Sequence, residues 1–339
     1  MKRWIFTLSF LLTLSLDAET ILVFGGKTGW IGQEMVKSIH SLGHHAVCAT
    51  SRLEHPQDIL NEIDRVKPDA IVNCAGIIGK PNVDWCETHK IETIRVNVLG
   101  TLNLIDAAHS RDIHITNVST GCIYEYDATH QERSGIGFTE NDPPNFNGSF
   151  YSRTKILMEA LALEYPNVLN LRIKMPISGD LKRGFVAKIV GYKKVIDVPN
   201  SLCILDDLIP IAVDMTLRKI KGNFNFVNPG VLSHTEVLQL YKTYVDPNHS
   251  WETFSVEEQN GILKARRANA ELSPAKLLEL YPNIPDIKDS LIRIFKHLAL
   301  IDSRAESLGS CKDIVLPVPA DRHPSDSACT SERQYSSGT

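Results

Sequence analysis

A glycine-rich segment between a short apolar run and a helical pattern constrains the fold of this chain more than any other feature. The apolar run covers residues 21–24 (ILVF), and the segment GGKTGWIG follows it with the spacing GxxGxxG. Apolar residues at helical spacing then continue to residue 42, where Gly43 ends the pattern. A dinucleotide pyrophosphate needs close approach of the backbone and the free N–H groups of a helix N-terminus. The segment therefore predicts a dinucleotide-binding loop made of Gly26, Lys27, Thr28, Gly29, Trp30, Ile31 and Gly32.

The first half of the chain alternates apolar runs with helical patterns. Apolar runs predict strands at residues 45–50, 70–73, 113–118 and 169–173, and amphipathic patterns predict helices at residues 92–109 and 150–164. This alternation is typical of βαβ units. We therefore predict an α/β fold with a Rossmann-like, doubly wound parallel sheet and a smaller C-terminal substrate-binding part.

The chain divides into four predicted parts. Residues 1–18 are a hydrophobic N-terminal extension, and residues 19–176 are the dinucleotide-binding Rossmann domain. Residues 177–300 are mainly a substrate-binding region, with helical patterns near 185–190, 206–218, 234–244 and 287–297 and a strand at 223–227. Residues 301–339 are rich in Ser, Pro and charge, and we predict that they form a disordered tail.

The N-terminal extension permits two interpretations. The basic start Met1-Lys2-Arg3 precedes an apolar run over residues 4–16, and Ala18 fits a cleavage site, so the segment resembles a short signal peptide. The other interpretation is an apolar extension that docks on the surface or frays. The run is too short to span a bilayer, and no other segment is long and apolar enough, so we expect no membrane span.

Composition argues against several other partners. The net charge is -4 and the chain has no basic stripe or tail, so we expect no nucleic-acid partner. Seven cysteines at irregular spacings, without a CxxC pair, match neither a disulfide framework nor a structural zinc site. We therefore expect no bound metal.

The residues after the second predicted strand indicate which nicotinamide cofactor fits. An acidic residue there would hold the ribose 2′-hydroxyl of NAD, whereas this chain has Thr50-Ser51-Arg52. Arg52 can pair with a 2′-phosphate, so we assign Ser51 and Arg52 to the cofactor site and favour NADPH, although Glu54 nearby leaves NADH open. The small residues after the third strand complete this site: Cys74, Ala75 and Gly76.

A tyrosine and a lysine four residues apart predict a reducing site. Tyr151 and Lys155 share one face of the helix predicted at residues 150–164. A nearby ammonium lowers the pKa of a phenol, so we expect Tyr151 to give its proton to a carbonyl oxygen as hydride reaches the carbon. Thr120, at the end of a predicted strand, is expected to orient that carbonyl. Tyr151 and Lys155 are also assigned to the cofactor site.

Four further segments carry a resemblance to a known family. They are GKPNVDWCE at 79–87, GCIYEYD at 121–127, PPNF at 143–146 and NPGV at 228–231. Together with the glycine-rich loop and the YxxxK pair, they resemble the nucleotide-rhamnose synthase/epimerase-reductase family of the extended short-chain dehydrogenase/reductase superfamily. This family also forms the C-terminal half of plant rhamnose synthases and is related to dTDP-4-dehydrorhamnose reductase. The resemblance covers residues 21–297.

The resemblance implies a bifunctional NADPH-dependent enzyme. It would epimerise a UDP- or dTDP-4-keto-6-deoxyglucose at C3 and C5 and reduce it at C4 to a nucleotide-L-rhamnose. In the family, a Cys beside the catalytic Thr and a Lys further along act as base and acid, and they match Cys122 and Lys188. The C4 ketone acidifies both neighbouring carbons, so a thiolate can remove a proton while Tyr151 and Thr120 stabilise the enolate oxygen. The resemblance places substrate contacts at Asn82, Val83, Asp84, Arg267 and Asn269.

Two other functions stay open. One is a 4-keto reductase alone, against which Cys122 argues. The other is a regulatory subunit resembling the methionine adenosyltransferase beta subunit, against which the intact Thr120, Tyr151 and Lys155 argue. The expected partner is a nucleotide-sugar substrate, and a homodimer is left open. NADPH and sugar nucleotides are made in the cytosol, so we expect a cytoplasmic protein, with the secretory pathway as the alternative if residues 1–18 act as a signal peptide.

Overall fold

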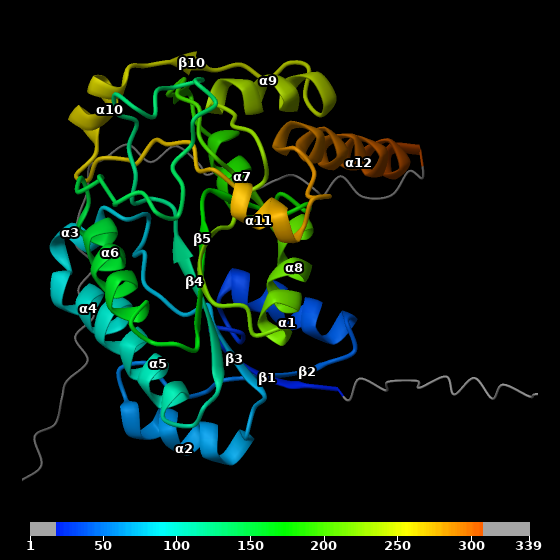
Figure 1. Cartoon of the computed structure of the whole chain (residues 1–339). Helices are drawn as coiled ribbons and strands as arrows, with labels where there is room; N and C mark the ends of the chain where they lie inside the picture. Colours follow the sequence, from blue (N-terminus) through cyan, green and yellow to red (C-terminus); the bar gives the residue numbers. More distant parts are fainter. Residues whose placement is uncertain (1–17, 308–339) are drawn as a thin grey trace, which may run out of the picture.

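In the computed structural model, which describes residues 18–307, six parallel strands form a central sheet (Figure 1). From one edge to the other they are β2 (His45–Cys48), β1 (Thr20–Phe24), β3 (Ala70–Asn73), β4 (His114–Thr120), β5 (Val168–Ile173) and β9 (Gly222–Asn225). The strand order reverses between β1 and β3, and such a switch point places a ligand crevice beyond the carboxyl ends of the strands. The predicted Rossmann-like, doubly wound sheet is confirmed.

Helices cover both faces of the sheet. They are α1 (Trp30–Ser41) and α8 (Leu205–Leu217) on one face, and α2 (Pro56–Val66), α5 (Thr101–His109) and α6 (Phe150–Ala162) on the other. Ile21 and Val23 of β1 pack with the first set, and Leu22 and Phe24 pack with the second. Because both faces are buried, β1 is a continuous apolar run instead of an alternating one.

The helical run at residues 90–109 is interrupted by a π-helical segment. It consists of α4 (Lys90–Ile94), the π-helix η1 (Arg95–Gly100) and α5. The sequence predicts one uniform helix over residues 92–109, so η1 is a departure from that prediction. Within η1, the side chain of Asn97 reaches the loop after β3 and bonds both backbone groups of Ile77, at 2.8 Å each. Such π-segments often mark functional sites.

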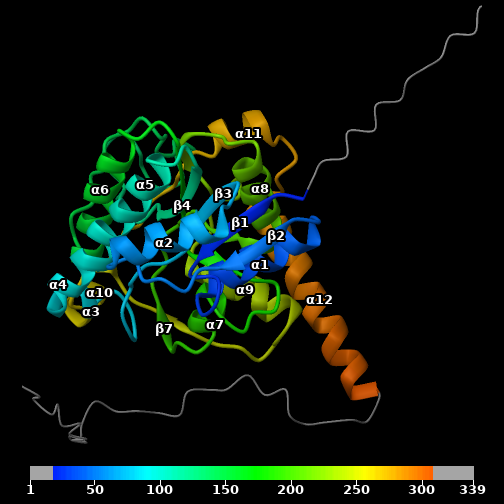
Figure 2. The ribbon, with the colours of Figure 1, turned by 90° about the horizontal axis from the view of Figure 1, so that it is seen from below.

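A second, smaller part lies beyond the carboxyl ends of the strands (Figure 1). Its elements are β6 (Pro176–Ile177), α7 (Phe185–Ile189), β7 (Lys194–Val195), β8 (Cys203–Ile204), α9 (His234–Tyr244), β10 (Glu252–Thr253), α10 (Val256–Ile262) and α12 (Ile287–Ser307). Strand β6 pairs with β8 and β7 with β10, both in parallel. Ile177, Leu238 and Phe295 belong to a separate apolar core of this part. Figure 2 shows α12 on the opposite side of the molecule from α4.

Two predicted boundaries differ from the structure. The division at residue 177 placed residues 206–218 and 223–227 in the substrate-binding region, but α8 packs on the central sheet and β9 pairs with β5 as its sixth strand. The predicted tail began at residue 301, whereas α12 continues to Ser307. Residues 1–17 and 308–339, which hold most of the predicted extension and tail, lie outside the described residues.

The short helices that the sequence patterns missed complete the chain. They are α2 after β2, α3 (Trp85–Thr88) after β3, α10, and α11 (Ala275–Leu280) near β9. Within residues 18–307, no helix combines the length and the apolar content that crossing a bilayer requires.

Candidate active site

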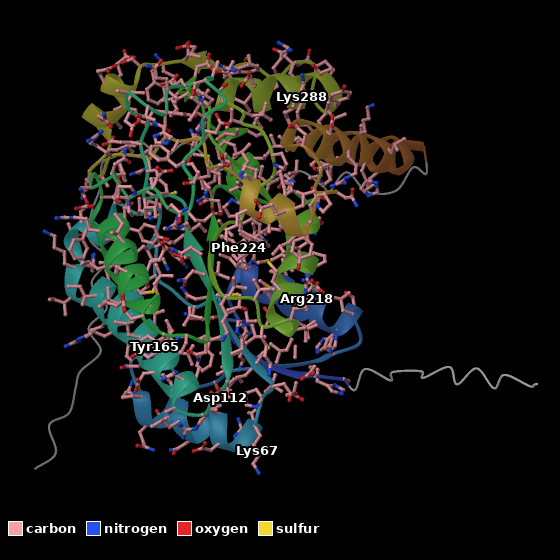
Figure 3. All side chains as sticks on the ribbon, viewed as in Figure 1. Lys67, Asp112, Tyr165, Arg218, Phe224 and Lys288 are labelled. Carbon is pink, nitrogen blue, oxygen red and sulfur yellow. The ribbon has the colours of Figure 1, made fainter. Side chains whose placement is uncertain are left out.

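The carboxyl ends of β1, β3 and β4 bring the predicted site segments to one edge of the sheet. The glycine-rich loop follows β1, residues 74–76 follow β3, and Thr120 with Cys122 comes at the end of β4, beside α6. Figure 3 labels Lys67 and Asp112, which precede β3 and β4 at the opposite edge. The predicted cofactor and reducing segments therefore share one end of the fold.

The glycine-rich loop turns tightly around the carbonyl oxygen of Gly25. Gly25 has a φ of 80°, and its carbonyl accepts a 2.9 Å hydrogen bond from the N–H of Gly29. A Cβ at Gly29 or Gly32 would lie 2.7 or 2.3 Å from that oxygen, so no side chain fits at either position. Helix α1 starts directly afterwards without a side-chain cap, which leaves its first N–H groups available to an anion.

The loop after β3 lies directly against this turn. A Cβ on Gly25 would lie 3.0 Å from the backbone nitrogen of Ala75, so the two loops pack backbone to backbone. The side chain of Asn73 accepts a 3.0 Å hydrogen bond from the Ala75 N–H, and Asn97 fixes Ile77 as described above. Burial raises the pKa of the Cys74 thiol to about 12, so this cysteine stays neutral. These contacts fit a rigid floor for a dinucleotide.

A buried glutamate from α2 organises the loop after β2. The carboxylate of Glu62 accepts hydrogen bonds from the N–H groups of Thr50 and Ser51 at 2.9 and 2.8 Å, and from both hydroxyls. These bonds lower the pKa of Glu62 although burial opposes them. Arg52 is exposed and pairs with Glu54 at 2.9 Å. Arg52 is thus accessible to a 2′-phosphate, which would compete with Glu54 for it.

Helix α6 presents the predicted tyrosine and lysine, and its first residues are anchored by two hydrogen bonds. Ser149 caps the helix by accepting a 3.0 Å hydrogen bond from the N–H of Ser152. The N–H of Phe150 donates to Glu87 of α3 at 2.6 Å. The buried hydroxyl of Thr120 lies near enough to the phenol of Tyr151 to lower its pKa. The structure therefore places Tyr151 and Thr120 at the same end of the sheet.

The electrostatics of the pair differ from the prediction in one respect. Burial raises the pKa of Tyr151, the nearby Cys122 raises it further, and the contact with Thr120 opposes the shift. The predicted lowering by Lys155 is therefore wrong, because burial raises the pKa and Lys155 is not among the groups that oppose this shift. Burial also lowers the pKa of Lys155 to about 8, against the opposing charge of Glu159. The site thus holds a neutral phenol, which is the form that can donate a proton.

Cys122 lies beside the phenol and remains partly exposed. Its N–H donates to the hydroxyl of Thr120 at 3.1 Å, and its carbonyl accepts a 2.6 Å hydrogen bond from Ser152. The thiol is free of any disulfide. Cys122 therefore follows the end of β4 as a free, partly exposed cysteine.

Two lysines, Lys188 and Lys174, differ in their burial and in their contacts. Lys188 lies on α7 and is exposed, and its side chain makes no hydrogen bond or ion pair with residues 18–307. Gly184, just before α7, packs against the ring of Trp30, where a Cβ would lie 2.5 Å from the indole. Lys174 is buried, donates to the carbonyl of Ala268 at 2.7 Å, and interacts electrostatically with Cys122. The structure does not bring Lys188 into contact with Cys122.

The predicted substrate residues meet on one side of this site. Asp84 and Arg267 form an ion pair of 2.9 Å, and the N–H of Asp84 donates to the side chain of Asn82 at 2.8 Å. Val83 between them is half-buried. Asn269 is buried, and its side-chain oxygen accepts a 3.0 Å hydrogen bond from Asn200. Four of the five residues, 82–84 and 267, therefore cluster, whereas the amide oxygen of Asn269 is already engaged.

Several residues important for this geometry were not predicted. Gly25 adjoins the glycine motif, and its place directly after the strand is a signal that could have identified it. Glu159 follows Lys155 by one helical turn, which is a weaker signal. Asn97, Ser152 and Lys174 act through contacts with distant segments, and no local pattern indicates them.

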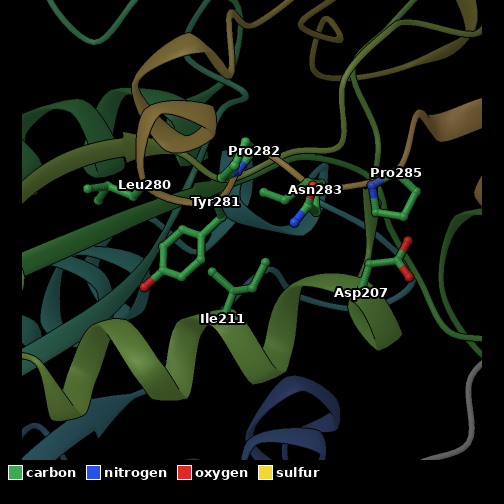
Figure 4. A pocket seen from close by; sticks show the side chains of 8 residues that line it. Asp207, Ile211, Leu280, Tyr281, Pro282, Asn283 and Pro285 are labelled. Carbon is green, nitrogen blue, oxygen red and sulfur yellow. The ribbon is translucent and has the colours of Figure 1, made fainter.

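A pocket of about 330 Å³ lies elsewhere, between α8 and the segment after α11 (Figure 4). Asp207, Ile211 and Tyr281 contribute to its lining, together with residues 282–285. Asp207 already accepts hydrogen bonds from Ser290 at 2.6 Å and Asn228 at 3.1 Å. The pocket contains none of the predicted site residues.

Comparison with known proteins adds independent evidence. Residues 21–177 match the family model described as the NAD dependent epimerase/dehydratase family. The chain is 49% identical over 270 residues to an Arabidopsis thaliana protein named bifunctional dTDP-4-dehydrorhamnose 3,5-epimerase/dTDP-4-dehydrorhamnose reductase, covering 79% of this chain and 90% of that protein.

Two further relatives extend this finding. An Arabidopsis thaliana trifunctional UDP-glucose 4,6-dehydratase/UDP-4-keto-6-deoxy-D-glucose 3,5-epimerase/UDP-4-keto-L-rhamnose-reductase is 49% identical over 79% of this chain, which spans 41% of that longer protein. The crystal structure of the L780 UDP-rhamnose synthase from Acanthamoeba polyphaga mimivirus is 38% identical, with a TM-score of 0.78, and the match covers 82% of this chain and 99% of that one.

Proposed function

This chain belongs to the NAD-dependent epimerase/dehydratase family, among the reductase/epimerase enzymes of nucleotide-rhamnose biosynthesis, and we propose that it is a bifunctional 3,5-epimerase/4-reductase. Its proposed substrate is a nucleotide-4-keto-6-deoxyglucose and its product a nucleotide-L-rhamnose. The observation that carries both activities is the placement of Cys122, Tyr151 and Thr120 at one edge of the sheet.

The residues around the glycine-rich loop fit a nicotinamide dinucleotide. The space that a Cβ at Gly29 or Gly32 would fill is kept clear, and the uncapped start of α1 offers N–H groups to a pyrophosphate. The backbone of Gly25 and Ala75 would lie beneath the bound cofactor. Arg52 would contact its adenosine end. When bound, the reduced cofactor supplies hydride. We propose NADPH because Arg52 is accessible and both carboxylates after β2 are engaged, Glu54 by Arg52 and Glu62 by the backbone of Thr50 and Ser51.

In the reduction step, Tyr151 donates its proton to the C4 oxygen. Burial keeps the phenol neutral until the carbonyl oxygen gains charge, so the proton is available at the moment it is needed. Thr120 donates a second hydrogen bond to the same oxygen. The positive charge of Lys155, one turn along α6, stabilises the phenolate that remains.

In the epimerisation steps, the thiolate of Cys122 removes a proton from the carbon next to the ketone. The electron pair moves into the C4 oxygen, which Tyr151 and Thr120 stabilise as an enolate. A proton is then returned to the opposite face of that carbon, and we propose Lys188 as its donor. Because Lys188 lies apart from Cys122 without ligands, this step requires the sugar to lie between α7 and the end of β4.

Arg267 is proposed to bind the nucleotide diphosphate, with Asp84 as the residue that positions it. Arg267 offers a planar fork that suits phosphate oxygens, and Asp84 orients it through their 2.9 Å ion pair. Both UDP and dTDP occur in the names of the relatives, and we propose that this chain acts on one of them.

The experiment that tests the epimerase claim measures solvent deuterium incorporation. The purified protein is incubated with UDP- or dTDP-4-keto-6-deoxyglucose in heavy water without NADPH. Deuterium at C3 and C5 is expected, and its absence with both substrates would contradict the epimerase activity.

A homodimer is proposed from the exposed faces of two adjacent helical segments. Helix α6 packs against α4 and η1, and their outward faces expose large apolar side chains: Ile91, Leu99, Leu157 and Leu161, each more than half exposed. A second copy would cover the same residues with an identical surface, as two-fold symmetry requires. Light scattering should report a dimer for the native chain and a monomer for Leu157→Asp with Leu161→Asp.

A further inference from the structure

Four asparagines form a continuous row across the centre of the sheet. Asn73, Asn117, Asn170 and Asn223 stand opposite one another in register on β3, β4, β5 and β9. Their side chains are joined by hydrogen bonds of 2.9, 3.0 and 3.1 Å. All four are buried. At the end of the row, the amide of Asn223 donates to Glu159 of α6 at 3.2 Å.

The direction of these hydrogen bonds is set by the two ends of the row. At one end, the Ala75 N–H requires that the Asn73 side chain presents its oxygen, so its NH₂ group faces Asn117. Each following amide then accepts on one side and donates on the other. At the far end the carboxylate of Glu159 can only accept. Aligned amides of this kind polarise one another, and here all of them direct an N–H toward Glu159.

Glu159 receives further donors that favour its carboxylate form. Arg172 of β5 forms a buried ion pair with it at 2.6 Å, and the hydroxyl of Ser119, next to Thr120, donates at 3.0 Å. A carboxylate in the interior is stable only when it is paired and hydrogen-bonded in this way. The mechanism proposed above does not use this group.

Glu159 lies on the same helix as Lys155. The two residues are four apart on α6, and both are buried. They form no direct ion pair among the described residues, yet the charge of Glu159 acts on Lys155. The other titratable or charged groups around this helix face are Arg172 on β5 and, near Tyr151, Cys86 of α3 and Cys122 after β4.

We propose that Glu159 is a positioning residue of the reductase site: a buried carboxylate, held by the asparagine row and Arg172, that keeps Lys155 in its charged form beneath Tyr151. Glu159 does not touch the substrate or the cofactor in this account. It acts through Lys155 and, by way of Ser119, on the strand end that carries Thr120. This inference rests on the proposed reductase function. The first test below does not require any activity.

The first test observes Lys155 directly by NMR in protein labelled with 13C at the lysine ε carbon. The Lys155 signal is identified by its loss in Lys155→Arg and followed from about pH 6 to about pH 11. In Glu159→Gln the midpoint of its titration should fall by about one pH unit or more, because an opposite charge has been removed from a buried ammonium. Glu164→Gln removes the same charge from an exposed position near the same helix and should leave the midpoint unchanged.

Two companion variants separate this effect from a loss of folding. Glu159→Asp keeps the charge and should restore most of the native midpoint. Glu159→Gln with Arg172→Met does not leave a buried arginine without its carboxylate partner, and its midpoint should also fall, because Glu159 and not Arg172 acts on Lys155. An unchanged midpoint in this double variant, or in a folded Glu159→Gln, would overturn the inference.

The second test follows the reduction of the keto-sugar. The alkaline limb of the kcat profile should move to lower pH in Glu159→Gln by the same amount as the NMR midpoint, with KM for the sugar little changed. If the native chain reduces no keto-sugar while the NMR midpoint shifts, the proposed function fails and the electrostatic role of Glu159 stands. If the native chain is active and the limb does not move, the inference fails and the function stands.

Discussion

The hydroxyl of Ser152 donates a 2.6 Å hydrogen bond to the carbonyl oxygen of Cys122. Ser152 follows Tyr151 on α6, and Cys122 lies two residues after Thr120, so this bond ties the phenol-bearing helix to the thiol-bearing loop. The same serine is held by the helix cap at Ser149. The proposed epimerase and reductase groups are thereby fixed relative to each other, and one ketone can serve both reactions.

Replacing Cys122 should separate the two activities. In Cys122→Ser, deuterium exchange at C3 and C5 should fall by about a hundredfold or more, because a hydroxyl is a far weaker base than a thiolate. Reduction of a substrate that is already epimerised should continue at a rate near that of the native protein. Cys311→Ser, which lies outside the described residues, serves as the control. Equal loss of both activities would argue against a distinct role for the thiol.

Reduction should decline at alkaline pH with the deprotonation of Lys155. Burial lowers the pKa of Lys155 to about 8, so its charge is present below that pH and is lost above it. The kcat of reduction should therefore fall on the alkaline side of about pH 8. Lys155→Met should be slow throughout and lack this limb. A native profile that stays flat up to about pH 10 would contradict the assigned role.

Arg52 should govern the choice between NADPH and NADH. In Arg52→Ala the KM for NADPH should rise about tenfold or more, because a charged hydrogen bond to the 2′-phosphate is lost. The KM for NADH should hardly change. Arg218→Ala, an exposed arginine at the end of α8 that also pairs with an acidic neighbour, is the matched control. Equal effects on both cofactors would remove Arg52 from the phosphate site.

A single methyl group at Gly32 should abolish cofactor binding. The added Cβ would lie 2.3 Å from the carbonyl oxygen of Gly25, so the loop must open to accommodate it. Dinucleotide affinity of Gly32→Ala, measured by calorimetry, should fall below detection while the circular dichroism spectrum is retained. Gly261→Ala, where nothing lies within 4 Å of the new methyl group, should bind like the native chain.

Replacing Lys188 should show whether this lysine returns the proton during epimerisation. If Lys188 returns the proton during epimerisation, Lys188→Ala should lose deuterium exchange at C3 or C5 and keep reduction of an epimerised substrate. Lys193→Ala tests whether an equally exposed neighbour has the same effect. A native exchange rate in Lys188→Ala would direct attention to Lys174, whose buried ammonium already interacts with Cys122.

Local patterns predicted the sheet and the site edge because both depend on short-range chemistry. The run at 21–24, the glycine spacing and the Tyr151–Lys155 pair each lie within one element and its turn. The membership of β9 in the sheet was missed because it depends on pairing with β5 across about fifty residues of chain. A periodicity argument cannot detect such a non-local contact.

The electrostatic error at Tyr151 has a similar origin. The sequence shows that an ammonium is four residues away, but it does not show how deeply the phenol is buried. In the folded protein the cost of burying charge raises the pKa of Tyr151, and Lys155 is not among the groups that lower it. The asparagine row could not be predicted from the sequence either, since its members come from four separate strands.

The most direct measurement incubates the purified chain with NADPH and each keto-sugar nucleotide, UDP- and dTDP-linked, and determines the configuration of the product by NMR. The account predicts a nucleotide-linked 6-deoxy-L-mannose, inverted at C3 and C5 and reduced at C4. A reduced 6-deoxyhexose that keeps the starting configuration at C3 and C5, or no reduced sugar with either substrate, would contradict it.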